Sequence, residues 1–195
     1  IGLIVNKSIP CNRSIIKDEG EEGQIKIIRI QEIVSPALLQ YLRIRKVSLT
    51  FARKYLKEAY YTVHERRYFA LAFKNDKGGH ELRNAKFKSG TSPKYITSIA
   101  GTDHSRLNVF EGFMDYLSAL VWYGREEADT PVLILNSAVM ENAAIEKIQS
   151  LGVRKLHLYP DWDTTGKQLA EHFRERLPEV EITDHSRLYA GYKDF

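Results

Sequence analysis

The chain has 195 residues, of which 43% are hydrophobic and 28% charged, and its formal net charge is +4. This composition is typical of a soluble globular protein, and no apolar run approaches the roughly 20 residues that a membrane-spanning helix requires. The single cysteine, Cys11, excludes an internal disulfide framework and a cysteine-based zinc site within the chain, and it fits a cytoplasmic protein.

The start of the sequence predicts an extension followed by two helices. Residues 1–35 show little periodicity, so we interpret them as a linker or N-terminal extension, with an exposed turn at 18–23 and one strand at 25–30. A helix is expected from Pro36, because proline is tolerated in the first helical turn. Ser48 can cap a second helix that follows directly.

The next stretch predicts a hairpin and a basic loop. Residues 68–73 have the pattern of a strand, residues 75–79 that of a hairpin turn, and a returning strand begins at Glu81. Basic and aromatic side chains then alternate over residues 86–95. We therefore expect residues 36–104 to form a small basic α+β subdomain.

From residue 107 the pattern changes to alternating strands and helices, which predicts a domain over residues 105–195 that the chain truncates at its C-terminus. Short connections between such units imply a parallel sheet with helices on both faces, so the fold class is α/β. The expected strands are 107–110, 132–135, 155–159 and 180–182, and the expected helices are 113–123, 141–150 and 165–177.

Acidic residues follow two of these strands at the point where each strand ends. Glu111 comes directly after the strand over 107–110, and Asp161 and Asp163 follow the strand over 155–159. Right-handed crossovers bring the carboxyl ends of parallel strands to one edge of the sheet, where ligands bind in such folds. We therefore expect these carboxylates to converge.

Converging carboxylates repel one another unless a cation compensates their charge. Oxygen ligands without cysteine or histidine favour Mg²⁺ or Mn²⁺ over Zn²⁺, so Glu111, Asp161 and Asp163 are candidate ligands of such an ion. Structural alternatives stay open. Glu111 and Asp115 can favour the positive end of the following helix, and Asp163 can cap the helix after it.

Three segments resemble the Toprim domain, which bacterial-type primases, type IA and type II topoisomerases and several nucleases share. The Glu-Gly-aromatic-Met-Asp form and the Asp-x-Asp followed by Thr-Gly look most like the bacterial-type DNA primase. The resemblance covers roughly residues 36–195 and is loose before residue 105. Its segments are Glu111-Gly112-Phe113-Met114-Asp115, Leu135-Asn136-Ser137-Ala138 and Tyr159-Pro160-Asp161-Trp162-Asp163-Thr164-Thr165-Gly166.

The resemblance implies roles for these residues. In that family the glutamate is proposed as a general acid/base and the aspartate pair as Mg²⁺ ligands, which makes Glu111, Asp161 and Asp163 the expected catalytic and metal-binding residues. A later Lys-Asp pair supplies a further carboxylate there, and Lys193-Asp194 looks like its counterpart, which adds Asp194 to the expected metal ligands.

One residue departs from the primase pattern. Primases commonly have glycine between the two aspartates, whereas this chain has Trp162. The indole can stack on a base or pack as an anchor, and packing is the favoured interpretation.

The basic stretch supplies candidate contacts to nucleic acid. From Arg43 to Lys94 the sequence has fourteen Lys and Arg against four Asp and Glu. Lysine and arginine provide most of the affinity for phosphates, and neighbouring aromatic rings can stack on unpaired bases. The alternative is a solvated surface that keeps the domain soluble. The candidates for phosphate contact are Arg83, Lys86, Lys88 and Lys94.

Together these observations favour a primase-type RNA polymerase core, a nucleotidyltransferase that makes short RNA primers on single-stranded DNA with Mg²⁺ or Mn²⁺. Its expected partners are the single-stranded DNA template, nucleoside triphosphates and a replicative helicase that binds through regions outside this chain. Two alternatives stay open, a Toprim nuclease and a catalytically silent DNA-binding module of a mobile element or plasmid replication system.

Overall fold

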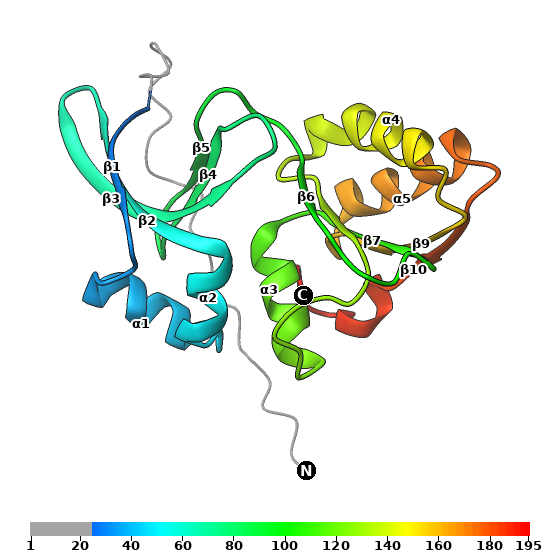
Figure 1. The fold of residues 1–195 in the computed structure, drawn as a ribbon, viewed down its shortest axis with the longest axis horizontal. Coiled ribbons are helices and arrows are strands. Elements are labelled where there is room, and N and C mark those ends of the chain that lie inside the picture. Colours follow the sequence, from blue (N-terminus) through cyan, green and yellow to red (C-terminus); the bar gives the residue numbers. More distant parts are fainter. Residues whose placement is uncertain (1–24) are drawn as a thin grey trace.

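The computed structural model describes residues 25–195 and arranges them as two parts side by side, each built on a five-stranded sheet (Figure 1). The turn expected at 18–23 and Cys11 lie outside the described residues. Within the described part, no helix is long and apolar enough to cross a membrane.

The first sheet is antiparallel throughout, and its strands follow one another in chain order. The predicted strand near residue 25 and the predicted hairpin at 75–79 are confirmed, whereas the sequence pattern misses β2 and β5. The first of these strands lies in the stretch interpreted as an extension, yet it pairs with β2. The strands are β1 (Lys26–Gln31), β2 (Leu56–Val63), β3 (Arg66–Lys74), β4 (His80–Arg83) and β5 (Lys88–Gly90).

Two helices pack on this sheet, α1 (Pro36–Ile44) and α2 (Leu49–Tyr55). The predicted cap of the second helix is confirmed, since the Ser48 hydroxyl accepts a hydrogen bond from the backbone N–H of Phe51 at 3.2 Å. The start of α1 is held differently. Glu58 Oε2, from the buried strand β2, accepts the backbone N–H groups of Val34 at 2.9 Å and Ser35 at 2.8 Å.

The second sheet has the order β10-β9-β7-β8-β6 and is parallel except for its edge strand β6. The predicted parallel sheet is therefore confirmed, with an antiparallel edge that the sequence pattern does not indicate. The strands are β6 (Thr97–Ile99), β7 (Leu107–Phe110), β8 (Val132–Ile134), β9 (Lys155–Tyr159) and β10 (Glu181–Asp184).

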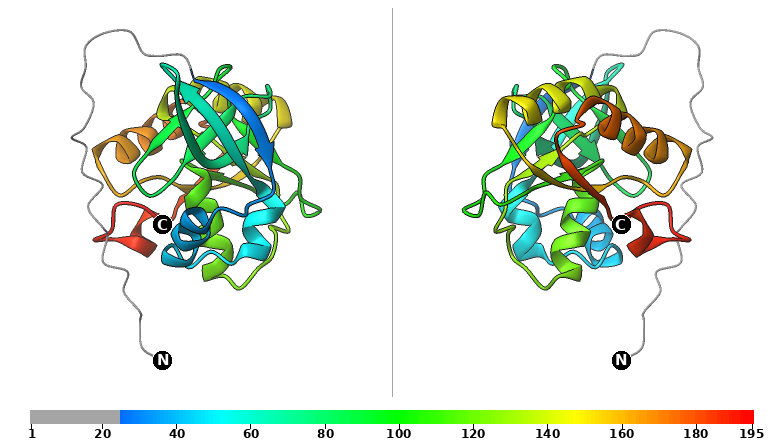
Figure 2. Two further views of the ribbon diagram at one scale, coloured as in Figure 1. Left: turned by 90° about the vertical axis from the view of Figure 1, so that its left-hand side faces the viewer. Right: turned by 90° about the vertical axis from the view of Figure 1, so that its right-hand side faces the viewer.

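Helices cover both faces of this sheet, as predicted (Figure 1; Figure 2). Alternate strand residues serve the two faces: Phe110 and Ile134 share a core with α3, and Val109 and Leu133 share one with α4 and α5. The helices are α3 (Phe113–Trp122), α4 (Glu141–Leu151) and α5 (Thr164–Arg176), with short 3₁₀ turns η1 (Ala138–Met140) and η2 (Ser186–Tyr189).

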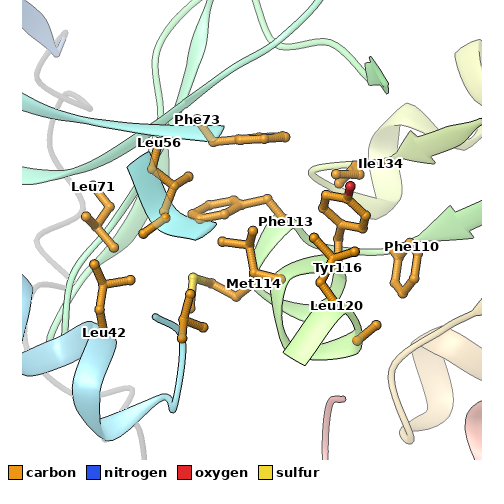
Figure 3. Packing of buried hydrophobic residues seen from close by; sticks show 14 of the residues in the cluster. Leu42, Leu56, Leu71, Phe73, Phe110, Phe113, Met114, Tyr116, Leu120 and Ile134 are labelled. Atoms are coloured by element: carbon orange, nitrogen blue, oxygen red, sulfur yellow. The ribbon is translucent and has the colours of Figure 1, made fainter. Parts of the chain in front are cut away.

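Helix α3 joins the two parts through a common apolar core (Figure 3). The rings of Phe73, from the first sheet, and Phe113, at the start of α3, stack with their centroids 5.0 Å apart. Further along the helix, the Tyr116 hydroxyl donates to the Tyr55 hydroxyl at 3.0 Å. Because this core belongs to both parts, it fixes the basic strands of the first against the strand ends of the second.

Candidate active site

Two acidic side chains meet at the carboxyl edge of the second sheet. Strands β7 and β9 are direct neighbours, with Phe110 opposite Tyr159, so the residues that follow them lie side by side. Glu111 Oε2 accepts the backbone N–H of Asp161 at 3.1 Å. The structure thus brings Glu111 and Asp161 together, and this hydrogen bond fixes one oxygen of the glutamate.

Two glycines make this close approach of chain segments sterically feasible. A Cβ at Gly112 would lie 2.6 Å from Asp115 Oδ2, and a Cβ at Gly166 would lie 2.0 Å from the carbonyl oxygen of Asp161. Both distances are shorter than any ordinary contact of a side chain. The glycines of the Glu-Gly-x-x-Asp and Asp-x-Asp-x-x-Gly patterns therefore have a local reason, which is to leave room for the acidic residues.

The carboxylates at this edge raise one another's proton affinity. Burial raises the pKa of Glu111, and repulsion from Asp163 adds to it. Burial raises the pKa of Asp161 to about 8, with Asp115, Glu111 and Asp194 contributing. Burial likewise raises the pKa of Asp115 to about 7, with repulsion from Asp194 next in size. Ionisation of all these carboxyl groups together is therefore unfavourable without a compensating cation.

Asp163 and Asp194 lie at the rim and have partners of their own. Asp163 caps α5, since its Oδ1 accepts the backbone N–H of Gly166 at 3.0 Å, and its Oδ2 lies 3.7 Å from Lys193 Nζ. Asp194 Oδ1 lies 3.8 Å from the Arg45 guanidinium. The two side chains are 36% and 35% exposed, so both can change partners without unpacking the core. The capping role expected as an alternative for Asp163 is thus present in the structure.

The donor set at this edge fits a hard divalent cation. Within residues 25–195, no three acidic, histidine or cysteine side chains stand close enough together to hold a metal ion as they are placed. The available donors are carboxylate oxygens, which Mg²⁺ and Mn²⁺ prefer, and their mutual repulsion is what a bound cation would relieve. Filling the site would require Asp163 and Asp194 to exchange Lys193 and Arg45 for the ion.

The basic strand β5 extends toward this acidic edge. Burial raises the pKa of Glu111 and of Asp115, and the exposed Lys88 side chain opposes that increase in both. Lys88 and Lys94 similarly oppose the rise that burial causes in the pKa of Glu81. Lysine side chains of the first part thus lie within electrostatic range of carboxylates in both parts.

The other predicted basic residues have more local settings. The Arg83 guanidinium Nε donates to the Tyr41 hydroxyl at 3.2 Å, which holds the arginine against α1. Lys86 lies in the turn between β4 and β5, and its backbone N–H donates to Asn84 Oδ1 at 2.9 Å.

Trp162 is a packing residue in this structure. Its partly buried ring lies against the core that α3 organises, and its backbone N–H donates to the Lys193 carbonyl at 2.6 Å. The Lys167 ammonium lies over the indole, 5.4 Å from the ring centroid. The residue therefore ties the Asp161–Asp163 loop to the C-terminal segment.

Two residues near the site were not among the sequence candidates for it. Asp115 is only 8% exposed and lies in the first turn of α3, three positions after the N-cap residue Gly112. The sequence offered a signal for it, since Asp115 ends the Glu-Gly-aromatic-Met-Asp segment that resembles the Toprim domain. Arg45, at the end of α1, pairs with Asp194 far along the chain, and no local pattern links the two.

Comparisons with known proteins agree with this architecture. A family model described as Toprim-like matches residues 108–195, and one described as a domain of unknown function, DUF8464, matches residues 27–92. No curated protein matches the chain in sequence.

Two solved structures share the fold. One is the primase fragment of the bacteriophage T7 primase-helicase protein, with a TM-score of 0.58 and 17% identity over 90% of this chain and 74% of that one. The other is the bacteriophage T7 lagging-strand DNA polymerase interacting with primase domains of two gp4 subunits bound to an RNA/DNA hybrid and dTTP. Its TM-score is 0.56, with 16% identity over 86% of this chain and 83% of that one.

Proposed function

Since residues 108–195 form a Toprim-like domain in a chain that shares the fold of a primase fragment, we propose that this protein is the catalytic core of a primase-type nucleotidyltransferase. It would join ribonucleotides into short RNA primers on a single-stranded DNA template. The observation that carries the proposal is the pairing of Glu111 with Asp161 within electrostatic range of Lys88. A carboxylate edge beside basic side chains suits a reaction between phosphates.

We propose that Glu111, Asp161, Asp163 and Asp194 hold Mg²⁺ or Mn²⁺. When bound, such an ion neutralises the triphosphate and supplies charge stabilisation in the transition state. The donor chemistry described above supports this assignment.

The protein's own side chains would position the reactants and move a proton. Lys88 binds a template phosphate as a point charge within electrostatic range of Glu111. Glu111 Oε2 is occupied by the N–H of Asp161, which leaves Oε1 either to bind a further ion or to accept the proton of the attacking 3′-hydroxyl. Burial raises the pKa of Glu111, and a base with a raised pKa accepts that proton more readily at neutral pH.

The template would lie on the basic subdomain, which we take as residues 36–104, ahead of a Toprim domain over 105–195. Arg83, Lys86, Lys88 and Lys94 would contact its phosphates, so binding should weaken steeply with salt. The phage structure in which primase domains are bound to an RNA/DNA hybrid and dTTP supports nucleic acid and nucleoside triphosphates as partners. A helicase would engage regions outside this chain, in the cytoplasm.

The test is a primer-synthesis gel with single-stranded DNA, labelled nucleoside triphosphates and Mg²⁺ or Mn²⁺. New short oligonucleotides are expected from the wild type and from Asp103→Asn, a control in an exposed loop where the amide oxygen can still accept the N–H of Ser105. The product should vanish in Asp161→Asn while DNA affinity stays within about twofold of the wild type, since the phosphate contacts are elsewhere.

Other outcomes assign the protein differently. Template degradation that depends on Asp161 would identify a Toprim nuclease. A second measurement uses Mn²⁺ binding, followed by electron paramagnetic resonance. Wild-type protein that neither makes product nor binds Mn²⁺ through Asp161 would be a silent DNA-binding module, and the proposal would be wrong.

A further inference from the structure

The face of the first sheet on which α1 packs carries further side chains beyond the helix. Leu71 of β3 lies on this face, since it belongs to the same apolar core as Leu38 and Leu42 of α1. Side chains alternate along a strand, so Phe69 and Arg67 point to the same side as Leu71. Phe69 is 36% exposed and Arg67 is exposed, so α1 leaves this part of the face open to solvent.

The neighbouring strands extend this surface. Tyr60 of β2 pairs directly with Phe69, and the centroids of the two rings lie 6.1 Å apart. Arg29 of β1 pairs with Tyr60, and its guanidinium carbon lies over the tyrosine ring, 4.5 Å from the centroid. We call Arg29, Tyr60, Arg67 and Phe69 the aromatic strip.

Phe69 is the ring of the strip that a ligand can reach. Tyr60 has the Arg29 guanidinium over its ring, so it supports the strip without receiving a ligand. The Phe69 ring is inclined by 37° to that of Tyr60, and among residues 25–195 no other aromatic ring or cation stacks on it. A ring that is more than a third exposed and has one tilted neighbour can stack on an unpaired base.

The strip is positively charged at its surface. Arg29 and Arg67 form no salt bridge within the described part of the chain. The acidic side chains that the strands place on this face, Glu58 and Glu81, are 0% and 7% exposed. Glu58 lies within electrostatic range of Arg29, but its Oε2 already accepts two backbone N–H groups. A phosphate chain on this surface would therefore meet two guanidinium groups and no exposed carboxylate of the same strands.

The strip is continuous with the phosphate contacts of the proposed template site. Arg83 of β4 is a diagonal neighbour of Phe69 on this face, and Lys88 of β5 pairs directly with Arg83. Lys88 in turn lies within electrostatic range of Glu111. A path from Lys88 over Arg83 and Phe69 therefore leads away from α3, toward the free end of the β2–β3 hairpin (Figure 1).

We propose that the aromatic strip binds single-stranded DNA and extends the template site by several nucleotides beyond Lys88. Phe69 would stack on one base, and Arg67 and Arg29 would contact neighbouring phosphates. The inference rests on the proposed function for the identity of the strand, because a primase core holds an unpaired template. None of the four residues of the strip touches the carboxylate edge, so the strip contributes to the hold on the template and not to the chemical step.

The test measures the binding of a fluorescein-labelled oligothymidylate of about 16 nucleotides to the full chain by fluorescence anisotropy, in a buffer that contains EDTA. Phe69→Ala should weaken binding at least about fivefold, which is the effect of losing one base stack. Tyr68→Ala is the matched control, because Tyr68 is 40% exposed and stacks on one ring, that of Tyr61, on the opposite face of the sheet. Its affinity should stay within about twofold of the wild type.

A second pair of variants tests the charge. Arg67→Gln removes a phosphate contact, so the slope of log affinity against log salt concentration should fall by about 0.7. Arg66→Gln alters the exposed neighbour that points to the opposite face, and it should leave the slope unchanged. Both arginines are exposed, so this comparison decides the matter even if Phe69→Ala does not fold.

The outcomes separate the strip from the proposed function. Equal binding by Phe69→Ala and Tyr68→Ala, or equal salt slopes for Arg67→Gln and Arg66→Gln, would overturn the strip, and primer synthesis by the wild type would then show that the proposed function stands without it. Variants that differ as expected in a protein that makes no primers would support the strip and count against the polymerase reaction alone. Polyglutamate of the same length is a further competitor. If it displaces the labelled DNA as well as unlabelled oligothymidylate does, the strip binds acidic chains in general and the proposal is wrong.

Discussion

At the scale of single residues, the packing of the carboxylate edge requires a residue without a side chain at position 112. Gly112 has no side chain, and the space that a Cβ would fill belongs to the Asp115 carboxylate. Asp115 is buried, so it cannot easily move away from an added methyl group. A side chain at position 112 would therefore displace the Asp115 carboxylate.

Gly112→Ala should destabilise the protein by about 1–3 kcal/mol, because an added methyl in a packed site forces displacement of its neighbours. It should also weaken Mn²⁺ binding at the carboxylate edge. Urea unfolding and Mn²⁺ titration measure the two effects. Asp115→Ala removes the atom that the new Cβ meets, so the double variant should lose less than the two single variants predict together. Strict additivity would contradict the contact.

The histidine pair makes stability depend on pH. Burial lowers the pKa of His157 and His185 in the folded state below the value of about 6.5 expected in an unfolded chain. The unfolded state then binds more protons below that value, so the stabilisation is present above about pH 6.5 and is lost as pH falls.

The free energy of unfolding should therefore decrease as pH is lowered from about 7 to 5, with a smaller decrease in His157→Gln/His185→Gln. Urea denaturation at a series of pH values measures this. His104→Gln alters an exposed histidine and serves as the control. A pH dependence that is identical in all three proteins would rule out the pair as its source.

At the scale of elements, a buried carboxylate organises the first helix. Burial raises the pKa of Glu58, but hydrogen bonds from Ser35, Tyr60 and Val34 lower it more, so the net pKa lies below its usual range. The glutamate replaces a side-chain cap on α1, since the Ser35 hydroxyl forms none. These hydrogen bonds link strand β2 to the start of helix α1 independently of apolar packing.

Glu58→Gln should destabilise the protein by about 1–3 kcal/mol at pH 7, because the buried acceptor loses its charge and exchanges one oxygen for an amide donor. The difference from the wild type should shrink as pH falls through the lowered pKa of Glu58, because the wild-type carboxylate then becomes protonated and loses its charge as well. Thermal unfolding monitored by circular dichroism measures both effects. Glu32→Gln, an exposed partner of Lys57, is the control and should change stability by less than about 0.5 kcal/mol.

The sequence predicts the elements of the second part well and those of the first part less completely. From β7 to α5 the elements begin and end within about two residues of expectation, because short buried strands alternate with helices that have clear starts. Strand β2 is missed because Leu56, Glu58 and Ala59 are all buried, which removes the alternation that marks a strand. Strand β6 has three residues and no periodicity to detect.

The candidate site likewise contains some contacts that the sequence predicts and others that it does not. The meeting of Glu111 with Asp161 follows from the topology of parallel strands, so it could be expected from their positions after two strands. The approach of Lys88 and of Arg45 to the carboxylates could not, because it depends on how the two parts pack. That packing is decided by tertiary contacts such as Phe73 on Phe113, which no local pattern encodes.

At the scale of the whole molecule, the two parts share one apolar core and should unfold together. Phe73 is 3% exposed and stacks on α3, so Phe73→Ala should destabilise the protein by about 3–5 kcal/mol. In the wild type, tryptophan fluorescence, which reports on the second part, and circular dichroism should give coincident denaturation curves.

Phe73→Ala should separate these two curves, because it removes the contact between the parts more than the core of either. Phe87→Ala truncates a ring that is 36% exposed and stacks within the first part, so its curves should stay coincident. Coincident curves in both variants would show that the interface does not couple the two parts.

The position of strand β6 determines where the polypeptide chain can be cut without damaging the second sheet. Its three residues precede the Toprim-like segment in the chain, yet they form the edge of that segment's sheet, and the carbonyl of Ile96 just before them accepts the N–H of Asp76 in the first part's hairpin turn. A cut at the apparent junction near residue 105 would leave β8 as a bare edge with unpaired backbone groups, which invites pairing between molecules. Gene fusions, truncations and natural recombination between modules of this kind should therefore succeed only when the breakpoint falls before residue 96.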